Sequence, residues 1–413
     1  MYLILFALLF SHFLLAEPIK MKIHGESAIL MNADTGAVLF EKKAHEQLYP
    51  ASTTKIATVL FALKGAPDLE ERMMIPRECL LKMSKKNKIE RQYKDLPYLL
   101  EPDGTSYWLK KGEILSLREL IFGVMLKSGN DAANMVAHQI GGSIPKFMEN
   151  LNAFLISIGC HSTHFANPHG LHHPEHYTTA YDLAIVTKEA LASNQFLEFV
   201  KTKEHLRPTT RLQEGRQIGQ TNKLLIKESP FYYPRALGVK TGYTENAGYC
   251  LVAAAKEGER TLIAVTLKCR ESAHRFIDVI ALFDAAFKEK KTSRVLFRQG
   301  STVFETEVAK NKLYTSLGKD IVLSFYPSEE EEVKTQLVWK KLKLPICVGD
   351  EVGVLSIVNE RGDVVAHELL YAANELQKSR KGWLWLIGLI IPSLAGGWLI
   401  FHKRHKKSSE AGL

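Results

Sequence analysis

The chain has 413 residues, of which 46% are hydrophobic and 24% are charged, a balance typical of a globular protein and not of a disordered one. The formal net charge is +9, but the last twelve residues contribute +3 of it, as four basic residues less Glu410, which leaves +6 elsewhere. A positive charge concentrated in this way gives weak support for nucleic-acid binding, and no nucleic-acid partner is expected.

The N-terminal segment 1–16 is apolar apart from Ser11 and His12 and ends at a small residue, which predicts an export signal peptide. The usual basic residues at its start are missing, and Leu14 stands where a small residue is preferred before cleavage. An uncleaved membrane anchor is therefore the alternative. Either version sends the chain across a membrane.

Two short alternating runs, 27–32 and 37–41, flank a turn signal at 33–36 and predict a β-hairpin. The next segment predicts a buried helix that begins at Ser52, because serine is a good N-cap residue, the interior is apolar and Gly65 follows as a stop. Lys55 lies three residues after Ser52, where side chains share one face of a helix. A hydroxyl and an amine placed together are what a serine nucleophile with a lysine base requires.

The middle of the chain predicts a helical block followed by strands. Helical patterns run over 115–126, 131–140 and 145–158, with a break at 127–130, and a further helix opens at the capping box 179–182. A hairpin is predicted over 249–255 and 261–269, and a helix over 273–287. Strands on either side of a helical block indicate an α+β fold, with an antiparallel sheet flanked by helices and a helical subdomain.

The C-terminal part predicts three further segments. Residues 291–374 have the short strands of a small all-β domain, with no catalytic constellation, and 375–381 form a linker. Residues 382–401 are twenty uncharged residues, enough for a helix of ~1.5 Å rise per residue to span a bilayer core of about 30 Å. The basic tail 402–413 should stay in the cytoplasm, which would place 17–381 outside the inner membrane.

Three short motifs carry the chemical signal. Ser-x-x-Lys at 52–55 is weak alone, because 143–146 and 316–319 also match it, although Pro145 and Gly318 spoil a helical pairing there. Ser-Gly-Asn at 128–130 follows in a loop between helices, and Lys-Thr-Gly at 240–242 leads into a core strand. The three motifs in this order are a strong signal for a serine acyltransferase.

Together with segments 32–36 and 165–171, these motifs resemble the low-molecular-weight, penicillin-binding D-alanyl-D-alanine carboxypeptidases. The resemblance covers 25–290, within a predicted catalytic domain 17–290, and 291–374 resembles the family's C-terminal β domain. It implies a β-lactamase-like fold and a serine enzyme that removes the terminal D-alanine from peptidoglycan stem peptides ending in D-Ala-D-Ala. β-Lactams would be its inhibitors, and neither a cofactor nor a metal is expected.

The resemblance also implies a role for each motif residue. Ser52 would be the nucleophile, neutral Lys55 its base, Ser128 the proton relay to the leaving amine, and Asn130 the group that orients Lys55 and the substrate amide. The residues expected to bind substrate are Lys240, Thr241, Gly242, Tyr243, Thr244 and Arg275, with Arg270 as a competitor for the arginine's role. Backbone N–H groups of Ser52 and Tyr243 would form the oxyanion hole. Asn222 lies in a segment that resembles one bordering the family's site, where some members have an arginine that this chain lacks.

Other features of the sequence have competing interpretations. The histidine-rich stretch 161–176 contains a match to the zinc motif H-x-x-E-H, but Pro174 inside it favours a polar loop near the cleft. The basic cluster within 82–94 is expected to be a solvated loop, with contact to anionic lipid or an acidic polymer as the alternative. The enzymatic alternative is a serine β-lactamase, although Glu175 is followed four residues later by Thr179 and not by the asparagine of the class A pattern. A non-catalytic wall-binding or scaffold protein is the alternative from another class. Cysteine spacing leaves open whether Cys250 and Cys269 pair.

Overall fold

The computed structural model describes residues 11–12, 17–66, 68–301 and 304–378, and it divides the chain into two compact units. The large unit comprises residues 15–292 and 325–331, and the small unit comprises 293–324 together with 332 onward and the N-terminal residues. The predicted membrane span 382–401 and tail 402–413 lie outside the described residues, as does the predicted signal segment apart from Ser11 and His12. Within the described residues, no helix is both long enough and apolar enough to cross a membrane.

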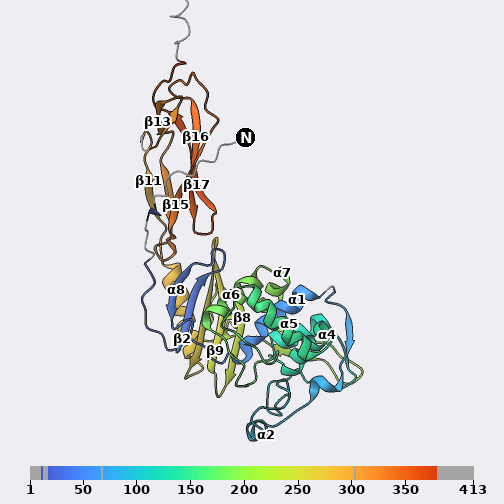
Figure 1. Ribbon diagram of the computed structural model, residues 1–413. Helices are drawn as coiled ribbons and strands as arrows, with labels where there is room; N and C mark the ends of the chain where they lie inside the picture. Colours follow the sequence, from blue (N-terminus) through green and yellow to red (C-terminus); the bar gives the residue numbers. More distant parts are fainter. Residues whose placement is uncertain (1–10, 13–16, 67, 302–303, 379–413) are drawn as a thin grey trace, which may run out of the picture. The chain divides into compact units, whose positions relative to one another are not determined.

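The centre of the large unit is a five-stranded antiparallel sheet with the order β3-β2-β10-β9-β8 (Figure 1). Its strands are β2 (Ser27–Asn32), β3 (Val38–Lys42), β8 (Ala236–Thr244), β9 (Gly248–Glu257) and β10 (Arg260–Cys269). In β10, Ile263 and Val265 pack into one hydrophobic core while Leu262 and Ala264 pack into another. Because successive side chains point to opposite faces, this alternation means that helices cover the sheet on both sides.

Helix α8 (His274–Phe287) covers one face through Phe276, Val279 and Phe283, and the sequence prediction of this helix is confirmed. The other face carries the helical block, whose innermost member α1 is buried over most of its length. This block consists of α1 (Lys55–Gly65), α3 (Leu117–Met125), α4 (Asn130–Gly141), α5 (Ile144–Ser157), α6 (Ala180–Leu191) and α7 (Asn194–Lys201). The predicted antiparallel sheet flanked by helices is therefore confirmed.

The expected start of the buried helix is wrong by three residues. A 3-10 helix, η1 (Ala51–Thr54), precedes α1, and Ser52 lies within it instead of capping the α-helix. Residues i and i+3 eclipse each other in 3-10 geometry. The tighter turn thus places Ser52 directly in line with Lys55, the first residue of α1.

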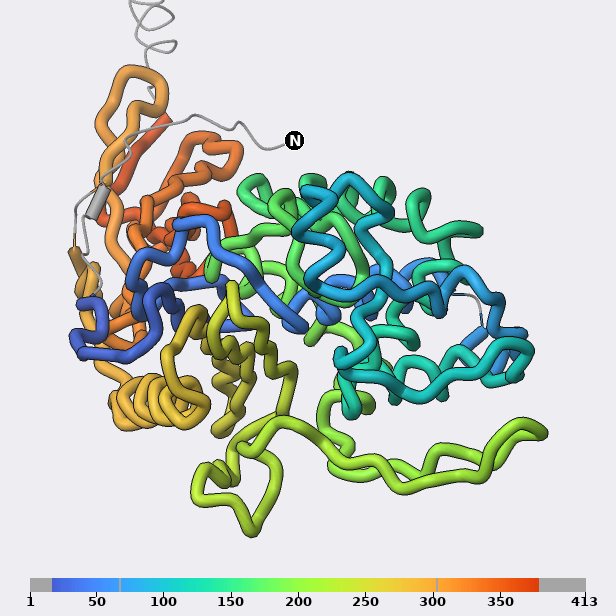
Figure 2. Tube along the Cα trace, turned by 90° about the horizontal axis from the view of Figure 1, so that it is seen from below, coloured from blue at the N-terminus to red at the C-terminus, as the bar shows by residue number. Residues whose placement is uncertain are grey.

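Smaller elements complete the large unit. They are β4 (Arg72–Met74), η2 (Arg77–Leu80), α2 (Lys85–Glu90), β5 (Ile114–Ser116), β6 (Glu204–Arg207), β7 (Arg216–Gly219) and η3 (Lys223–Leu225). Strands β6 and β7 pair as a hairpin, which Figure 2 shows as a yellow-green arm. A fully buried ion pair between Arg207 and Glu113, at 2.6 Å, fixes the end of this hairpin to the loop before β5.

The small unit is all-β. The sheet β1-β15-β16-β17-β13-β12 runs through β1 (Ser11–His12), β12 (Glu305–Val308), β13 (Asn311–Leu317), β15 (Val333–Trp339), β16 (Glu351–Asn359) and β17 (Val364–Ala372). A separate pair joins β11 (Thr292–Phe297) to β14 (Ile321–Phe325). The sheet buries a core that includes Leu313, Leu355 and Leu370.

The sequence pattern of the acidic run 329–332 most simply predicts a solvated turn, but the structure leaves its four residues partly buried. Its first residue, Glu329, is the last residue of η4 (Pro327–Glu329), which belongs to the large unit. Glu329 is nearly buried and bonds Arg260 at 2.7 Å and Asn32 at 3.0 Å. These charge-assisted contacts explain why segment 325–331 groups with the large unit, although the predicted boundary assigned it to the all-β domain.

Candidate active site

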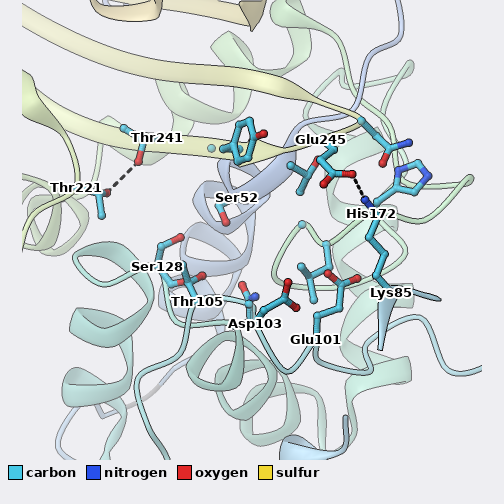
Figure 3. Close-up of a pocket in the computed structure, with 18 of the residues that line it drawn as sticks. Ser52, Lys85, Glu101, Asp103, Thr105, Ser128, His172, Thr221, Thr241 and Glu245 are labelled. Atoms are coloured by element: carbon cyan, nitrogen blue, oxygen red, sulfur yellow. Dashed lines mark hydrogen bonds and ion pairs between the residues drawn. The ribbon is translucent and has the colours of Figure 1, made fainter. Parts of the chain in front are cut away.

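A cleft of about 440 Å³ opens on the large unit beside the N-terminal end of α1. Figure 3 shows Ser52 at its middle, with Thr241 and Thr221 toward one end and Glu245, Lys85 and His172 toward the other. Eight of the ten predicted site residues line it: Ser52, Ser128, Asn130, Thr241, Gly242, Tyr243, Thr244 and Arg275. The other two, Lys55 and Lys240, are fully buried.

Ser52 is held in the cleft by a strained turn. Ala51, just before it, has a φ of 49°, in the left-handed region that costs a non-glycine residue of order 1 kcal/mol or more. Gly170 packs against this turn with a φ of 87°, and a Cβ added there would lie 1.9 Å from the Ala51 carbonyl oxygen. Only glycine fits this position, so the 165–171 segment supports the turn that presents the Ser52 hydroxyl.

The Lys55 amine has three close partners. Its Nζ lies 2.9 Å from Ser52 Oγ, 2.8 Å from Asn130 Oδ1 and 2.6 Å from the main-chain oxygen of His169. A carbonyl and an amide oxygen can only accept hydrogen bonds, whereas a hydroxyl can also donate one. When Lys55 is neutral, its two N–H groups therefore point to Asn130 and His169, and its lone pair is left facing the Ser52 hydroxyl. The geometry directs the serine proton to Lys55.

Burial favours the neutral form of Lys55. The loss of solvation lowers the pKa of its amine well below the ordinary value, and the positive charge of Lys240 lowers it further. The carboxylate of Asp131 acts in the opposite direction. Lys240 is itself fully buried, and burial together with Arg275 lowers its pKa to about 7. Lys240 can thus release a proton near neutral pH, and the surroundings of Lys55 favour its neutral form.

The low pKa of Lys240 predicts a stability that depends on pH. In the unfolded chain this amine keeps its proton up to about pH 10.5, but the folded protein loses it above about 7. The unfolded state then binds more protons, so the contribution of Lys240 to the free energy of unfolding rises with pH, by at most ~1.4 kcal/mol per pH unit. Chemical unfolding of both proteins tests this. The free energy of unfolding of the wild type minus that of Lys240→Met should increase from about pH 7 to pH 9. A constant difference would contradict the lowered pKa.

Ser128 and Asn130 come from the junction between α3 and α4. Ser128 has a φ of 61°, which turns the chain sharply into the cleft. Thr105, in the loop before β5, holds this turn through two hydrogen bonds. Its hydroxyl donates to the Ser128 carbonyl at 2.7 Å, and its carbonyl accepts from the Asn130 N–H at 2.9 Å. Asp131 accepts from the main chain of Tyr107 and Leu109. The motif is therefore fixed by main-chain contacts before any substrate binds.

Strand β8 passes very close to η1 at Gly242. A Cβ added at Gly242 would lie 3.0 Å from the Pro50 oxygen, 3.1 Å from the Ser52 nitrogen and 3.2 Å from Ala51 Cβ. The absence of a side chain lets the strand bring the main chain around Tyr243 beside that of Ser52. Two backbone N–H groups on adjoining segments are the usual form of an oxyanion hole.

Gly242→Ala should therefore reduce activity without unfolding the protein. The added methyl group must push β8 away from η1 by a few tenths of an ångström, and we expect kcat/KM to fall by roughly 10- to 100-fold. Gly219→Ala on β7 is the matched control, because its Cβ would meet nothing within 4 Å. Steady-state kinetics and thermal melting of both variants test this; equal kcat/KM for the two would show that the close approach is unimportant.

The Thr241 end of the cleft is arranged for an anion. The hydroxyls of Thr221 and Thr241 are 2.9 Å apart, and Arg275 donates to the main-chain oxygens of Gly242 at 2.9 Å and Cys250 at 3.3 Å. Arg275 is buried at the cleft wall, whereas Arg270, the competing candidate, is exposed and is not among the lining residues described. Of the two candidate arginines, Arg275 is therefore the one that the structure places at the cleft. The positive charge of Arg275 and the hydroxyls of Thr221 and Thr241 together suit a carboxylate ligand.

Three side chains of the histidine-rich segment form hydrogen bonds with the main chain. His169, His173 and His176 each accept a backbone N–H on Nδ1, from Leu171, Glu175 and Ala166 respectively. Their Nε2 atoms face the Tyr98 oxygen, the Tyr93 oxygen and the Thr54 hydroxyl, with the tautomers assigned from these bonds. Both ring nitrogens of each histidine are engaged. The segment is therefore a loop beside the cleft, as expected, although most of it is buried.

Sequence reasoning missed one end of the cleft. Lys85, Glu101, Asp103, His172 and Glu245 line it, yet none belongs to the three catalytic motifs. The sequence predicts a solvated loop for the basic cluster, but Lys85 reaches the cleft and Lys88 is buried. The positive charge of this cluster was the one sequence signal that could have indicated this end of the cleft. Its partners could not be identified because they lie far away in the sequence.

The five cysteines, all within described residues, are free thiols. Cys269 lies opposite Tyr249 in the β9–β10 pairing, next to Cys250 along the chain. Burial raises the pKa of both thiols, to about 11 for Cys250 and about 12 for Cys269. These thiols therefore remain protonated and chemically quiet at neutral pH.

Comparisons with known proteins agree with this geometry. The family model described as D-alanyl-D-alanine carboxypeptidase, Peptidase_S11, matches residues 14–271. D-alanyl-D-alanine carboxypeptidase DacF of Bacillus subtilis is 32% identical over 86% of each chain, and DacD of Escherichia coli is 28% identical over 85% of this chain and 86% of its own. The crystal structure of penicillin binding protein 5 from Haemophilus influenzae, 25% identical, superposes with a TM-score of 0.59 and covers 88% of this chain and 100% of that one.

Proposed function

This chain belongs to the D-alanyl-D-alanine carboxypeptidases of peptidase family S11, and we propose that it removes the terminal D-alanine from peptidoglycan stem peptides through an acyl-enzyme on Ser52. The single observation that carries this proposal is the surroundings of Lys55. Two of its three partners can only accept hydrogen bonds, so its lone pair faces Ser52. A buried neutral amine in that position is a general base for the serine.

The reaction begins when Ser52 Oγ attacks the carbonyl carbon of the penultimate D-alanine and gives its proton to Lys55. The carbonyl oxygen becomes an oxyanion, which the N–H groups of Ser52 and Tyr243 stabilise by ~3 kcal/mol per donor. The carbon–nitrogen bond then breaks as the leaving amine takes a proton through Ser128. Free D-alanine departs, and water hydrolyses the remaining ester to regenerate Ser52.

Substrate orientation follows from the charges of the cleft. The carboxylate of the terminal D-alanine binds at the end where Thr241, Thr221 and Arg275 meet, with buried Lys240 adding positive potential. Asn130 holds the substrate amide while it fixes Lys55. The exposed ring of Tyr243 stacks on Tyr249 at 4.4 Å between centroids, which positions the main chain of β8.

The direct test is to incubate the purified protein with a pentapeptide ending in D-Ala-D-Ala and to measure released D-alanine by mass spectrometry. Release of one D-alanine per peptide, and labelling by penicillin that persists, are the expected results. Rapid turnover of penicillin without D-alanine release would favour the serine β-lactamase. If the protein neither releases D-alanine nor is labelled by penicillin, the non-catalytic wall-binding scaffold would be the remaining interpretation.

We also propose a location for the protein, from the composition of its two terminal segments. Segment 1–16 would export the chain, 382–401 would anchor it in the cytoplasmic membrane, and the basic tail would stay inside. The active site would then face the wall peptides. Protease treatment of intact spheroplasts should digest the large unit of a full-length chain but spare an epitope placed after residue 413. An unaffected large unit would contradict this topology.

A further inference from the structure

The small unit ends close to the predicted membrane span. Near its C-terminal end, the main chain of Leu376 exchanges two hydrogen bonds of 2.9 Å with that of Ile346. The uncharged run 382–401 begins six positions after Leu376. Six residues extend over at most about 22 Å, so if this run spans the bilayer, Leu376 is held near the membrane surface. The following inference rests on that proposed location.

The loop 341–348 lies at this same end of the small unit. It begins after β15, where Lys340 donates its N–H to the Val352 oxygen at 2.9 Å, and it leads into the pairing with Leu376. The Gly349 N–H then donates to the Ala372 oxygen at 2.9 Å, which continues that pairing. The loop is therefore beside the segment through which the chain leaves the unit.

Successive side chains of the loop alternate between the core and the solvent. Leu342 and Leu344 are partly buried against the core of the small unit, and Ile346 belongs to that core. The exposed residues between and after them are Lys341, Lys343, Pro345 and Cys347. The loop is thus fixed from beneath, while its outer face carries two positive charges beside apolar groups.

The two lysines of this outer face are available to bind an anion. Neither Lys341 nor Lys343 has an ion-pair partner within the described part of the chain, whereas the neighbouring Lys340 pairs with Glu351. Segments 340–351 and 374–381 together contain six basic and three acidic residues, a net charge of +3. A bilayer surface that contains anionic phospholipids attracts such a segment over about one Debye length, ~8–10 Å.

Val348 adds an apolar group next to these lysines. It is 66% exposed, in a turn where Cys347 donates its N–H to the Asp350 carboxylate at 2.8 Å and accepts the Asp350 N–H at 3.1 Å. A single exposed valine is common on protein surfaces, so its exposure alone indicates nothing. Its place beside two unpaired lysines and a predicted span suits the headgroup layer of a membrane, where the charges meet phosphate and the apolar group leaves water.

We propose that the loop 341–348 is a second membrane-contact site of this protein. Lys341 and Lys343 bind the phosphate groups of anionic phospholipids, and Val348 enters the headgroup layer. Because the span already holds the loop near the surface, even a weak contact is well populated. A single tether would let the small unit rotate about it, and the second contact restricts that rotation.

The test uses Cys347, the exposed member of the five cysteines, to carry an environment-sensitive fluorophore on the full-length chain. The chain is inserted through its predicted span into vesicles of phosphatidylcholine, with or without phosphatidylglycerol. In vesicles with phosphatidylglycerol, the emission should shift to the blue, and a lipid with a quencher on its headgroup should reduce it. In phosphatidylcholine alone, both effects should be weaker.

Two variants separate the charges from the apolar group. Lys341→Gln/Lys343→Gln should lower the ratio of membrane-bound to free loop roughly tenfold in vesicles with phosphatidylglycerol. Val348→Asp should remove the blue shift. Lys319→Gln is the control for charge, because Lys319 is exposed in the turn after β13, outside the loop, and this variant should keep the wild-type signal.

The control for position moves the fluorophore to residue 360, as Glu360→Cys in a Cys347→Ser background. Glu360 is exposed in the turn after β16, about 25–30 Å along that strand from the loop, so its label should report water in both kinds of vesicle. Equal signals at the two positions, or a signal at Cys347 that does not depend on phosphatidylglycerol, would overturn the inference. A chain that fails to float with the vesicles would overturn the proposed span, and the inference with it.

Discussion

Ser52→Ala is expected to reduce D-alanine release from a pentapeptide by about 10⁴-fold or more, and to abolish penicillin labelling. The hydroxyl is the atom that forms the acyl-enzyme, and loss of a nucleophile leaves only binding and the oxyanion hole to act on the substrate. The substitution removes one oxygen from a side chain that lines an open cleft. The fold should therefore be retained, which circular dichroism and the Tm can verify.

Ser143→Ala is the control for this prediction, because Ser143 begins another Ser-x-x-Lys match. Its hydroxyl accepts the Lys146 N–H at 3.3 Å and caps α5. The variant should lose about 1 kcal/mol of unfolding free energy, as cap removal usually does, and keep its activity. If Ser143→Ala lost labelling, or Ser52→Ala kept it, the nucleophile would be misassigned.

Lys55→Met should slow acylation by roughly 10³-fold. Methionine has a similar length but no amine, so the proton of Ser52 has no acceptor during attack. Stopped-flow acylation with a chromogenic cephalosporin measures the step directly. Raising the pH should not restore the rate, since no residue remains at that position to titrate.

The matched control is Lys64→Met on the same helix. Lys64 is half exposed and pairs with Glu189 at 2.8 Å on the surface, so its loss should change stability by less than about 1 kcal/mol and leave acylation unchanged. An acylation rate for Lys55→Met within tenfold of the wild-type rate would exclude Lys55 as the base.

Local patterns explain what could be predicted from the sequence. The β2–β3 and β9–β10 hairpins and helix α8 follow from alternation, turn residues and helical periodicity over neighbouring positions. The motif residues were also found, because spacing within each motif is short. Their assembly into one cleft depends on the sheet placing β8 beside η1, which the order of the motifs indicated only through a resemblance.

Long-range contacts explain what could not be predicted. Lys55 meets Asn130 across 75 positions, and Lys85 meets Glu245 across 160. Arg260 draws Glu329 into the large unit across 69 positions. Such charged pairs leave no periodic trace in a single sequence. The 3-10 turn at Ala51–Thr54 was missed for a related reason: it is stabilised by Gly170, a residue far along the chain.

The central claim, that Ser52 is the acylated nucleophile, is tested most directly by locating the adduct formed with penicillin. After quenching and digestion with trypsin, Ser52 lies in the peptide 44–55, whereas Ser128 lies in the peptide 128–146. Mass spectrometry should find a single penicilloyl group, on 44–55, with fragment ions that assign it to Ser52. An adduct on 128–146, or an unmodified protein after prolonged exposure, would contradict the account.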